Sequence, residues 1–179
     1  MTDYDAVVYD LDGTLVHLDV DWEAVEREVR GVYHAADLEP PGNGLWDMLE
    51  AASELDVADD VEAAIAEYER AGARRSRRLP RADELPDRET QIGVCSLNCE
   101  AACRIALDEH DLTDGVDVVV GRDTVSNQKP HPEPLLKAVA ELDVAPDRTL
   151  FIGDSATDER TADRAGVAFE YVGDGPSGV

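Results

Sequence analysis

The sequence predicts an α/β fold: a parallel five-stranded sheet flanked by helices and interrupted after its first strand by a small helical insert. Two observations support this prediction. From Gln91 onward, short apolar runs alternate with helical patterns of about ten residues, which is typical of right-handed crossovers in a parallel sheet. Between Asp21 and Leu79, apolar residues recur at helical spacing and no strand pattern is visible. A chain of 179 residues has room for one such domain with its insert, but not for a second large domain.

The individual elements follow from local pattern. The first strand is expected at 6–9, where a β-branched and aromatic run too short for a helix leads into a turn at Gly13. Further strands are expected at 92–95, 116–120, 149–152 and 167–172, with helices at 100–109, 133–142 and 158–165. The insert should hold three helices, whose apolar stripes are Trp22, Val25, Val29 and Tyr33, then Leu45, Met48, Leu49 and Ala52, then Val61, Ile65 and Tyr68. Turns at 40–44 and 56–60 separate them.

The charge of the chain limits its partners. There are 41 acidic and 16 basic residues, and the formal net charge of −25 repels nucleic acid and anionic membranes. Only Lys129 and Lys137 are lysines, and all other basic residues are arginines. An acidic, lysine-poor chain rich in Ala and Val resembles proteins of halophiles that work in molar salt, and an acidic mesophilic protein is the alternative. The oligomeric state cannot be predicted from the sequence.

Several other classes of site and location are disfavoured. No run is long and apolar enough for a membrane helix, and the acidic start of the chain does not resemble a signal peptide, so we expect a cytoplasmic protein. Cys95, Cys99 and Cys103 lack the paired spacing of a zinc site and are expected to be small buried residues, with a redox role as the alternative. The four histidines show no metal-ligand spacing, and we assign them no role.

Asp10 and Asp12 follow the first strand directly and are the leading candidates for chemistry. In open α/β sheets, ligands bind in the crevice beyond the carboxyl ends of the strands. Two carboxylates two residues apart at this position can act on one bound group. The alternative is an Asp-rich turn, because Asp favours turns through local hydrogen bonds.

Three other strand ends offer polar groups that could meet Asp10. Ser96-Leu97-Asn98 follows the second strand, at a helix start that can hold an anion, although Ser and Asn also serve as simple caps. Lys129, whose own backbone is restricted by the proline that follows it, suits a phosphate or a developing negative charge. Asp154 and Asp158 follow the fourth strand and bring the carboxylates at this edge to four. Four carboxylates at one edge repel one another unless a cation lies between them, and hard oxygen ligands of this kind favour Mg²⁺. Considered by itself, Asp158 could instead interact favourably with the positive end of the helix dipole at the start of the following helix.

Together these four motifs resemble those of the haloacid dehalogenase superfamily of phosphotransferases, in the same chain order. The first motif matches Asp10-Leu11-Asp12-Gly13-Thr14-Leu15, the second Ser96, the third Lys129 in Lys-Pro-His-Pro-Glu-Pro, and the fourth Gly153-Asp154-Ser155 with Asp158. The resemblance implies strand order 5-4-1-2-3 and a helical cap inserted after the first motif. It places the catalytic core at 1–18 and 82–179 and the cap at 19–81.

The resemblance also implies roles for individual residues. Asp10 would be the nucleophile that forms an aspartyl-phosphate, and Asp12 would protonate the leaving alcohol and then activate water. Mg²⁺ would be held by Asp10, the carbonyl of Asp12 and Asp154, with Asp158 tightening that set. Lys129 would offset charge in the transition state. Phosphate or substrate binding is expected from Gly13, Thr14, Ser96, Leu97 and Asn98.

The predicted function is a Mg²⁺-dependent phosphomonoester hydrolase acting on a small phosphorylated metabolite, for which phosphoglycolate-type substrates are a candidate. Asp12 disfavours carbon-halogen cleavage, because a halide leaves without protonation. A sugar-phosphate mutase of the same superfamily is one alternative, and a non-catalytic phosphate- or metal-binding module is another.

An arginine cluster at 74–81 carries much of the positive charge of the insert: Arg74, Arg75, Arg77, Arg78 and Arg81. Part of it could steer an anionic substrate toward the site. The alternative is pairing with a helix C-terminus and with neighbouring acids.

Overall fold

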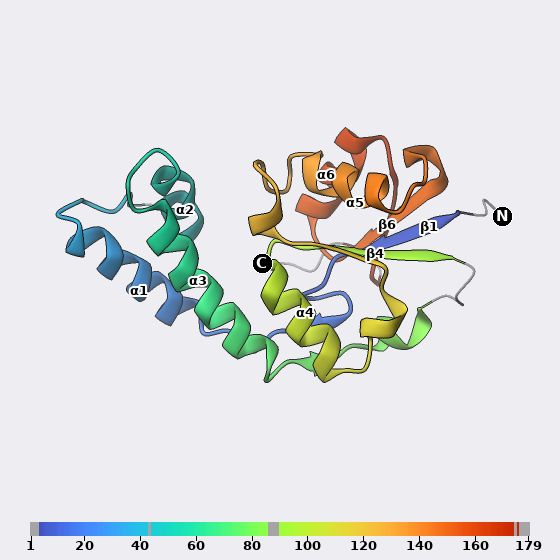
Figure 1. Ribbon diagram of the computed structural model, residues 1–179, viewed down its shortest axis with the longest axis horizontal. Coiled ribbons are helices and arrows are strands. Elements are labelled where there is room, and N and C mark those ends of the chain that lie inside the picture. The colour runs from blue at the N-terminus through green and yellow to red at the C-terminus, as the bar shows by residue number, and fades with distance from the viewer. Residues whose placement is uncertain (1–3, 43, 86–89, 174, 176–179) are drawn as a thin grey trace.

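The computed structural model describes residues 4–42, 44–85, 90–173 and 175. Three helices form a lobe on one side of the molecule, and a sheet with helices on both faces forms the other side (Figure 1). None of the helices in the described part of the chain has the length and apolar character that crossing a membrane requires.

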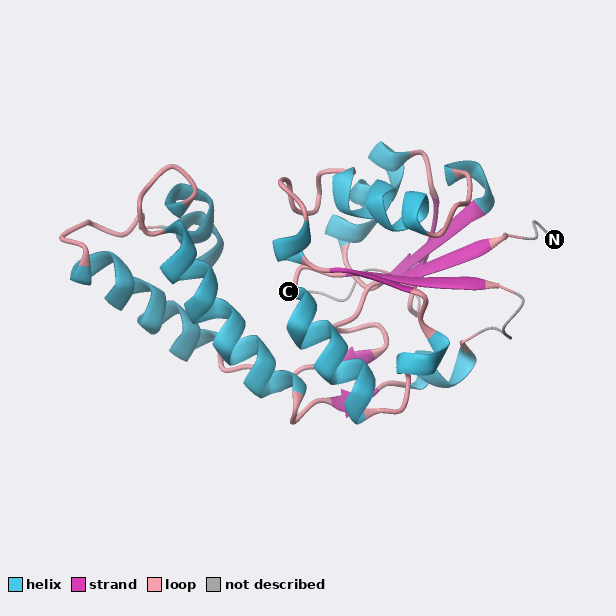
Figure 2. Cartoon of the chain, in the orientation of Figure 1, coloured by secondary structure: helices cyan, strands magenta, loops and turns pink. Residues whose placement is uncertain are grey.

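The main sheet has five parallel strands, as predicted (Figure 2). They are β1 (Ala6–Tyr9), β4 (Gln91–Cys95), β5 (Val118–Val120), β6 (Thr149–Gly153) and β7 (Ala168–Tyr171). Their order across the sheet is β5-β4-β1-β6-β7. When these five strands are numbered one to five along the chain and read from the β7 edge, this is the predicted order 5-4-1-2-3. β1 is therefore central, with β4 and β6 beside it in parallel register.

Helices cover both faces of this sheet because its strands are apolar on both sides. On β1, Val8 packs in the cluster beneath α5 (Glu133–Glu141) and α6 (Ala156–Ala165). The next residue, Tyr9, packs in the opposite cluster with residues of α4 (Glu100–Glu109). Successive side chains of a strand point to opposite faces, so one apolar run supplies both layers of the core.

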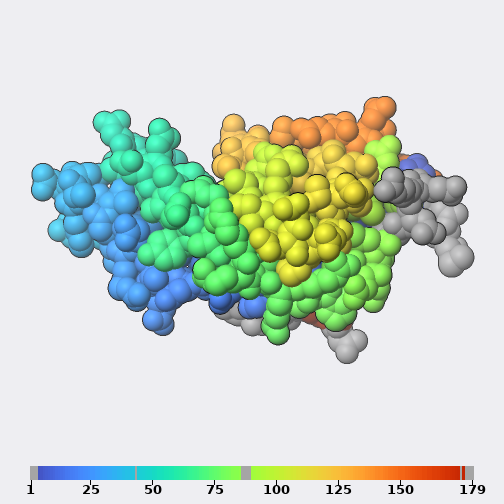
Figure 3. Space-filling model, turned by 60° about the horizontal axis from the view of Figure 1, so that its bottom comes forward, coloured from blue at the N-terminus to red at the C-terminus, as the bar shows by residue number. Residues whose placement is uncertain are grey.

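The helical lobe consists of α1 (Trp22–Ala35), α2 (Leu45–Ala52) and α3 (Ala58–Ala73), as the apolar stripes predicted. It has its own core, in which the buried Tyr33 hydroxyl donates to the carbonyl of Met48 at 2.6 Å. The end of α3 leaves this lobe core: Ala66 and Ala73 belong to the cluster on the α4 face of the sheet. In Figure 3 the green surface of α3 lies directly against the yellow-green surface of α4.

The prediction that residues 21–79 contain no strand is wrong. β3 (Arg77–Arg78) pairs with β2 (Val16–His17) as a two-stranded antiparallel sheet where the chain leaves and re-enters the core. Strands of two residues are too short to leave an alternating pattern in the sequence. Short 3-10 helices were also not foreseen, at Pro80–Glu84, Thr113–Gly115, Arg122–Thr124 and Pro146–Arg148.

Most predicted strand and helix ends agree with the structure to within one residue, but α3 begins at Ala58, inside the turn expected at 56–60, because the chain already turns at 53–57. Two other boundaries differ by two residues for local reasons. The strand expected from 116 begins at Val118, because Val116 still donates its N–H to Thr113 in a 3-10 turn. The last helix begins at Ala156 and not at 158, because Ser155 caps it and accepts from the N–H of Asp158.

Candidate active site

The carboxyl ends of β1, β4 and β6 bring distant parts of the sequence to one edge of the sheet. Asp10 follows β1, Ser96 follows β4 and Asp154 follows β6. They line a cavity of about 190 Å³ that opens between the sheet edge and the helical lobe. Eight predicted site residues line this cavity: Asp10, Asp12, Ser96, Leu97, Asn98, Lys129, Asp154 and Asp158.

Lys129 is the cation at the centre of the site. Its ammonium Nζ donates to Asp10 Oδ1 at 2.8 Å, to Asp158 Oδ1 at 2.5 Å and to the Cys95 carbonyl at 3.1 Å. It also lies 5.6 Å from the ring centroid of Phe151. Burial acts to lower the pKa of Lys129, but the two carboxylates outweigh it and hold this pKa above its ordinary value. The lysine therefore stays charged.

Asp10 is buried, and its Oδ1 is held by Lys129. Burial raises the pKa of Asp10 to about 7, against the lowering effect of the Lys129 ammonium, and the nearby charge of Asp158 adds to the rise. Desolvation of this kind leaves a carboxylate that gains stability from any cation placed beside it.

Asp12 occupies a different environment from Asp10. Its Oδ1 accepts from the N–H of Leu18 at 2.9 Å and lies 3.5 Å from Nδ1 of His17. Burial raises the pKa of Asp12, while the Leu18 N–H and His17 oppose that rise. A carboxyl with a raised pKa is better able to carry a proton. The sequence predicts no role for His17, and no pattern in it indicates this contact with Asp12.

Gly13 and Thr14 do not line the cavity; they build the turn beneath it. The N–H of Gly13 donates to Val16 and that of Thr14 donates to Leu11. Gly13 has φ of +89°, and a Cβ there would overlap the Asp154 carboxylate. The buried Thr14 hydroxyl has no hydrogen-bond partner among the described residues. A phosphate-binding role for these two residues stays a prediction.

Ser96 and Asn98 hold each other at the start of α4. Ser96 Oγ donates to Asn98 Oδ1 at 3.1 Å and accepts from the Asn98 N–H at 3.1 Å. Both side chains are buried yet reach the cavity wall, next to Leu97. A hydroxyl and an amide therefore face the same space as Asp10 and Lys129.

Three carboxylates could hold a metal ion. Oxygens of Asp10, Asp154 and Asp158 lie within 4.8 Å of one another, and an all-oxygen set of this kind suits Mg²⁺. Burial raises the pKa of Asp154, and the charge of Asp158 adds to the effect. Asp158 is already committed to other partners: Oδ1 to Lys129, and Oδ2 to the N–H and hydroxyl of Ser155 in the capping box of α6. Asp10 and Asp154 are therefore the less encumbered ligands.

Two tryptophans outside the predicted set of site residues line the cavity from the lobe. Trp22 begins α1 and Trp46 follows the first residue of α2; their ring centroids are 5.8 Å apart. They are 37% and 44% exposed. Helical spacing predicts Trp22 only as part of the apolar stripe of the first helix of the insert. The signal available was that the only two tryptophans of the chain both stand at expected helix starts.

The arginines of the 74–81 cluster do not line the cavity. Arg75 donates to Asp19, Arg78 pairs with Asp83, and Arg81 pairs with Glu84 and Glu170. Arg74 donates to the carbonyl of Arg70 near the end of α3. These contacts match the pairing alternative. Steering of substrate by the cluster stays a prediction with no direct contact to support it.

The three cysteines are free and buried, as predicted. Burial raises the pKa of Cys95 and of Cys99 to about 12, and that of Cys103 well above its ordinary value. Such thiols remain protonated and unreactive.

Known proteins share both the sequence and the fold of this chain. The sequence model of the haloacid dehalogenase-like hydrolase family matches residues 44–172. Phosphoglycolate phosphatase of Rhodospirillum rubrum is 33% identical over 184 residues, covering 90% of this chain and 76% of that protein. The chain belongs to the haloacid dehalogenase-like hydrolases.

Other relatives of this hydrolase agree with that assignment. Phosphoglycolate phosphatase of Escherichia coli K12 is 43% identical over 60 residues, which is 34% of this chain and 24% of that protein. A Lactobacillus plantarum structure assigned as a phosphoglycolate phosphatase has a TM-score of 0.65 at 27% identity, covering 96% of this chain and 86% of that one. CbbY from Rhodobacter sphaeroides shares the fold, with a TM-score of 0.71 at 19% identity over 97% of this chain and 87% of that one. By family and relatives, this hydrolase is a phosphatase.

Proposed function

We propose that the protein hydrolyses phosphomonoesters of small metabolites, with Mg²⁺, through an aspartyl-phosphate formed on Asp10. The observation that carries the proposal is the convergence of Asp10, Asp12, Lys129 and Asp154 on one small cavity. Asp10 and Asp12 differ in environment, as two carboxyl groups with different tasks must.

In the first step, a carboxylate oxygen of Asp10 attacks phosphorus. Lys129 holds Oδ1, so Oδ2 is the oxygen available for attack. The new O–P bond forms as the bond from phosphorus to the leaving alcohol breaks, and Asp12 supplies the proton that the alcohol takes. In the second step, Asp12 removes a proton from water, which attacks phosphorus and releases inorganic phosphate from Asp10.

The remaining residues bind and neutralise charge. Ser96 Oγ would donate to a phosphoryl oxygen, Asn98 would orient the substrate, and Lys129 offsets charge on the transferring group. Asp10, Asp154 and the carbonyl of Asp12 would hold Mg²⁺, with Asp158 acting mainly through Lys129. Bound Mg²⁺ would supply positive charge to the phosphoryl oxygens.

We further propose that the substrate is a small phosphorylated acid such as phosphoglycolate. A cavity of about 190 Å³ leaves little room beyond a phosphate and a short leaving group. Phosphoglycolate phosphatase of Rhodospirillum rubrum matches 90% of this chain at 33% identity. We propose that residues 19–81 form a cap over a core of 1–18 and 82–179, with Trp22 and Trp46 as its contribution to the cavity wall.

A panel of small phosphoesters, assayed with Mg²⁺ in molar KCl, tests this function. We expect release of inorganic phosphate from at least one carboxylated ester, and loss of that activity by more than about 1,000-fold in Asp10→Asn with the fold retained by circular dichroism. Asp5→Asn is the matched control, because Asp5 is an exposed aspartate paired with Arg148 outside the cavity. Silence across the panel, or an active Asp10→Asn variant, contradicts the proposal. Transfer of labelled phosphate to a second sugar hydroxyl would indicate a mutase instead.

A further inference from the structure

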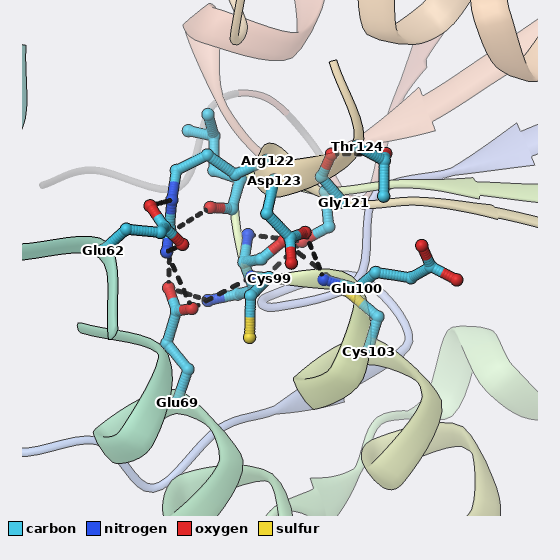
Figure 4. A network of polar contacts seen from close by, with 12 residues as sticks. Glu62, Glu69, Cys99, Glu100, Cys103, Gly121, Arg122, Asp123 and Thr124 are labelled. Atoms are coloured by element: carbon cyan, nitrogen blue, oxygen red, sulfur yellow. Dashed lines mark hydrogen bonds and ion pairs between the residues drawn. The ribbon is translucent and has the colours of Figure 1, made fainter. Parts of the chain in front are cut away.

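A buried carboxylate from the helical lobe is inserted into the core beside the site. Glu69, on α3, is 0% exposed. Its oxygens accept from Arg122 and from the Cys99 N–H at 2.9 Å (Figure 4). They also accept from the Asn98 side-chain amide at 3.2 Å. Neither Glu69 nor Arg122 touches the cavity that holds Asp10. The proposed reaction therefore does not account for this buried charge.

Arg122 binds two glutamates of the same helix. Its Nη1 donates to Glu69 Oε1 at 2.7 Å and to the carbonyl of Leu97 at 2.7 Å. Its Nη2 and Nε donate to Glu62, about two turns earlier on α3, at 2.7 and 3.0 Å. Burial acts to lower the pKa of Arg122, but hydrogen bonds and charge from Glu62 and Glu69 raise it overall. The guanidinium thus joins α3 to the backbone of the 96–98 segment.

These contacts continue without interruption to Ser96. Glu69 holds the Asn98 amide nitrogen, Asn98 Oδ1 accepts from Ser96 Oγ, and the Asn98 N–H donates back to that oxygen. The Ser96 hydroxyl proton can turn to a phosphoryl oxygen while the Asn98 N–H continues to hold Oγ. The direction of Ser96 Oγ therefore depends on where Glu69 holds Asn98.

The energetic cost of this arrangement argues for a task. Removing the Glu69 carboxylate and the Arg122 guanidinium from water is expensive, and apolar residues of similar size are often as stabilising or more so. Two acids also face one arginine, so the excess negative charge is offset by neutral donors, the Asn98 side-chain amide and the Cys99 N–H at the N-terminal end of α4. A purely structural contact between α3 and α4 would not need these groups.

We propose that Glu69 is a positioning residue: a carboxylate of the lobe which, held by Arg122, fixes Asn98 and so directs Ser96 Oγ at the phosphoryl group. The inference rests on the proposed function, because the task of Ser96 is part of it. If Glu69 has this role, the phosphate site is complete only when α3 packs against α4. Glu62 contacts Arg122 but not Asn98, so it supports the arrangement without directing Ser96.

A double-mutant cycle between Glu69→Gln and Ser96→Ala tests the proposal, with phosphoglycolate and Mg²⁺. Gln has one acceptor oxygen where Glu69 offers two, so Arg122, Asn98 and Cys99 must compete for it. We expect kcat/KM to fall about tenfold in Glu69→Gln, and by no more than about twofold when the same change is made in Ser96→Ala. A merely structural effect would give losses that multiply, because it would act on both backgrounds alike.

Glu67→Gln is the matched control: the same change on the same helix, at an exposed residue paired with Arg70. It should leave kcat/KM unchanged, and Glu62→Gln should have a smaller effect than Glu69→Gln. If Glu69→Gln does not fold, the variant that combines it with Arg122→Gln removes both buried charges, which a fold tolerates better than loss of one. The cycle with Ser96→Ala is then run on that variant. Multiplying losses, or a Glu69→Gln enzyme as active as Glu67→Gln, would overturn the proposal.

Inorganic phosphate separates this proposal from the function on which it rests. Phosphate with Mg²⁺ should raise the Tm of the wild type, and should raise it less in Glu69→Gln than in Glu67→Gln. If no ester is hydrolysed but this difference is found, the proposed hydrolysis fails and the positioning role stands. If esters are hydrolysed and the two variants respond alike to phosphate, the positioning role fails alone. If the wild type shows neither turnover nor stabilisation, both fail.

Discussion

At Lys129, one ammonium group lies between the buried carboxylates of Asp10 and Asp158, with Asp154 close to both. The site therefore contains more negative than positive charge. The Lys129 ammonium stabilises the carboxylates of Asp10 and Asp158, and its loss would leave the three carboxylates repelling one another. A metal ion and the lysine act in the same sense here, since both neutralise the same group of oxygens.

Replacing Lys129 should consequently destabilise the fold as well as stop catalysis. We expect Lys129→Met, measured by urea unfolding in EDTA, to lower the free energy of unfolding by about 3–5 kcal/mol, the cost of an uncompensated buried charge. Mg²⁺ should recover part of this loss by binding the same carboxylates. The chain supplies its own control: Lys137, the only other lysine, forms an exposed pair with Glu141, and Lys137→Met should leave stability unchanged. Equal effects of the two substitutions would contradict this account of the site.

Gly13 allows a second test, because its missing side chain leaves room for Asp154. Gly13→Ala places a methyl group on that carboxylate, so we expect kcat/KM to fall at least about 100-fold, the size of effect that an ångström of misplacement produces. Gly166→Ala is the matched control: its φ is also positive, at +68°, but a Cβ there meets nothing within 4 Å. It should lower stability by about 1 kcal/mol and leave kcat/KM intact. A fully active Gly13→Ala enzyme would show that Asp154 is not needed where the structure has it.

The sequence predicted most residues of the site because each follows a strand of a parallel sheet. Asp10, Ser96 and Asp154 are distant in the chain, but the rule that strand ends meet at one edge was enough to group them. Glu69 and Arg122 could not be predicted in this way, because neither follows directly from the end of a strand. Nothing near Glu69 distinguishes it from the exposed acids of the same helix, and its partner lies 53 residues further along the chain. Such a contact depends on how α3 packs against α4, which no local pattern encodes.

At the scale of elements, helices were located better than the connection between lobe and core. The apolar stripes of α1, α2 and α3 are long enough to define a face, so their positions were predicted. β2 and β3 contain two residues each, and their pairing is decided by where the two connecting segments run. Gly72 belongs to the same junction: a Cβ there would overlap Val20 and the Asp19 backbone, and only a glycine lets the entering segment pass α3 so closely.

The first turns of α1 and α2 carry a natural reporter of ligand binding. Trp22 and Trp46 are the only tryptophans, and both line the cavity that holds Asp10. Their emission should therefore change when inorganic phosphate and Mg²⁺ bind, because the surroundings of both indoles change together. Trp46→Phe should keep a weaker response from Trp22 alone. The prediction is wrong if phosphate raises Tm without altering the emission of the wild type.

For the whole molecule, the dominant physical fact is a net charge of −25 on 179 residues. Most arginines with described partners pair with acids, including Arg75 with Asp19 and Arg81 with Glu170 at the junction of lobe and core. These pairs leave a large excess of exposed carboxylates that repel one another across the surface. The repulsion favours expansion of the chain, and it weakens as salt shortens the distance over which charges act.

Stability should accordingly rise with salt. We expect the urea midpoint of unfolding to increase between roughly 0.1 M and roughly 2 M KCl, because screening falls from a length of about 10 Å to a few ångströms. A variant that combines Glu28→Lys and Glu109→Lys, both at exposed helical positions, has less repulsion to screen and should gain less from the same salt. If the midpoint of the wild type falls with KCl, or if the variant gains as much as the wild type, then self-repulsion does not limit the stability of this protein. The hypothesis of adaptation to molar salt would then lose its physical basis, since relief of that repulsion is what high salt would provide.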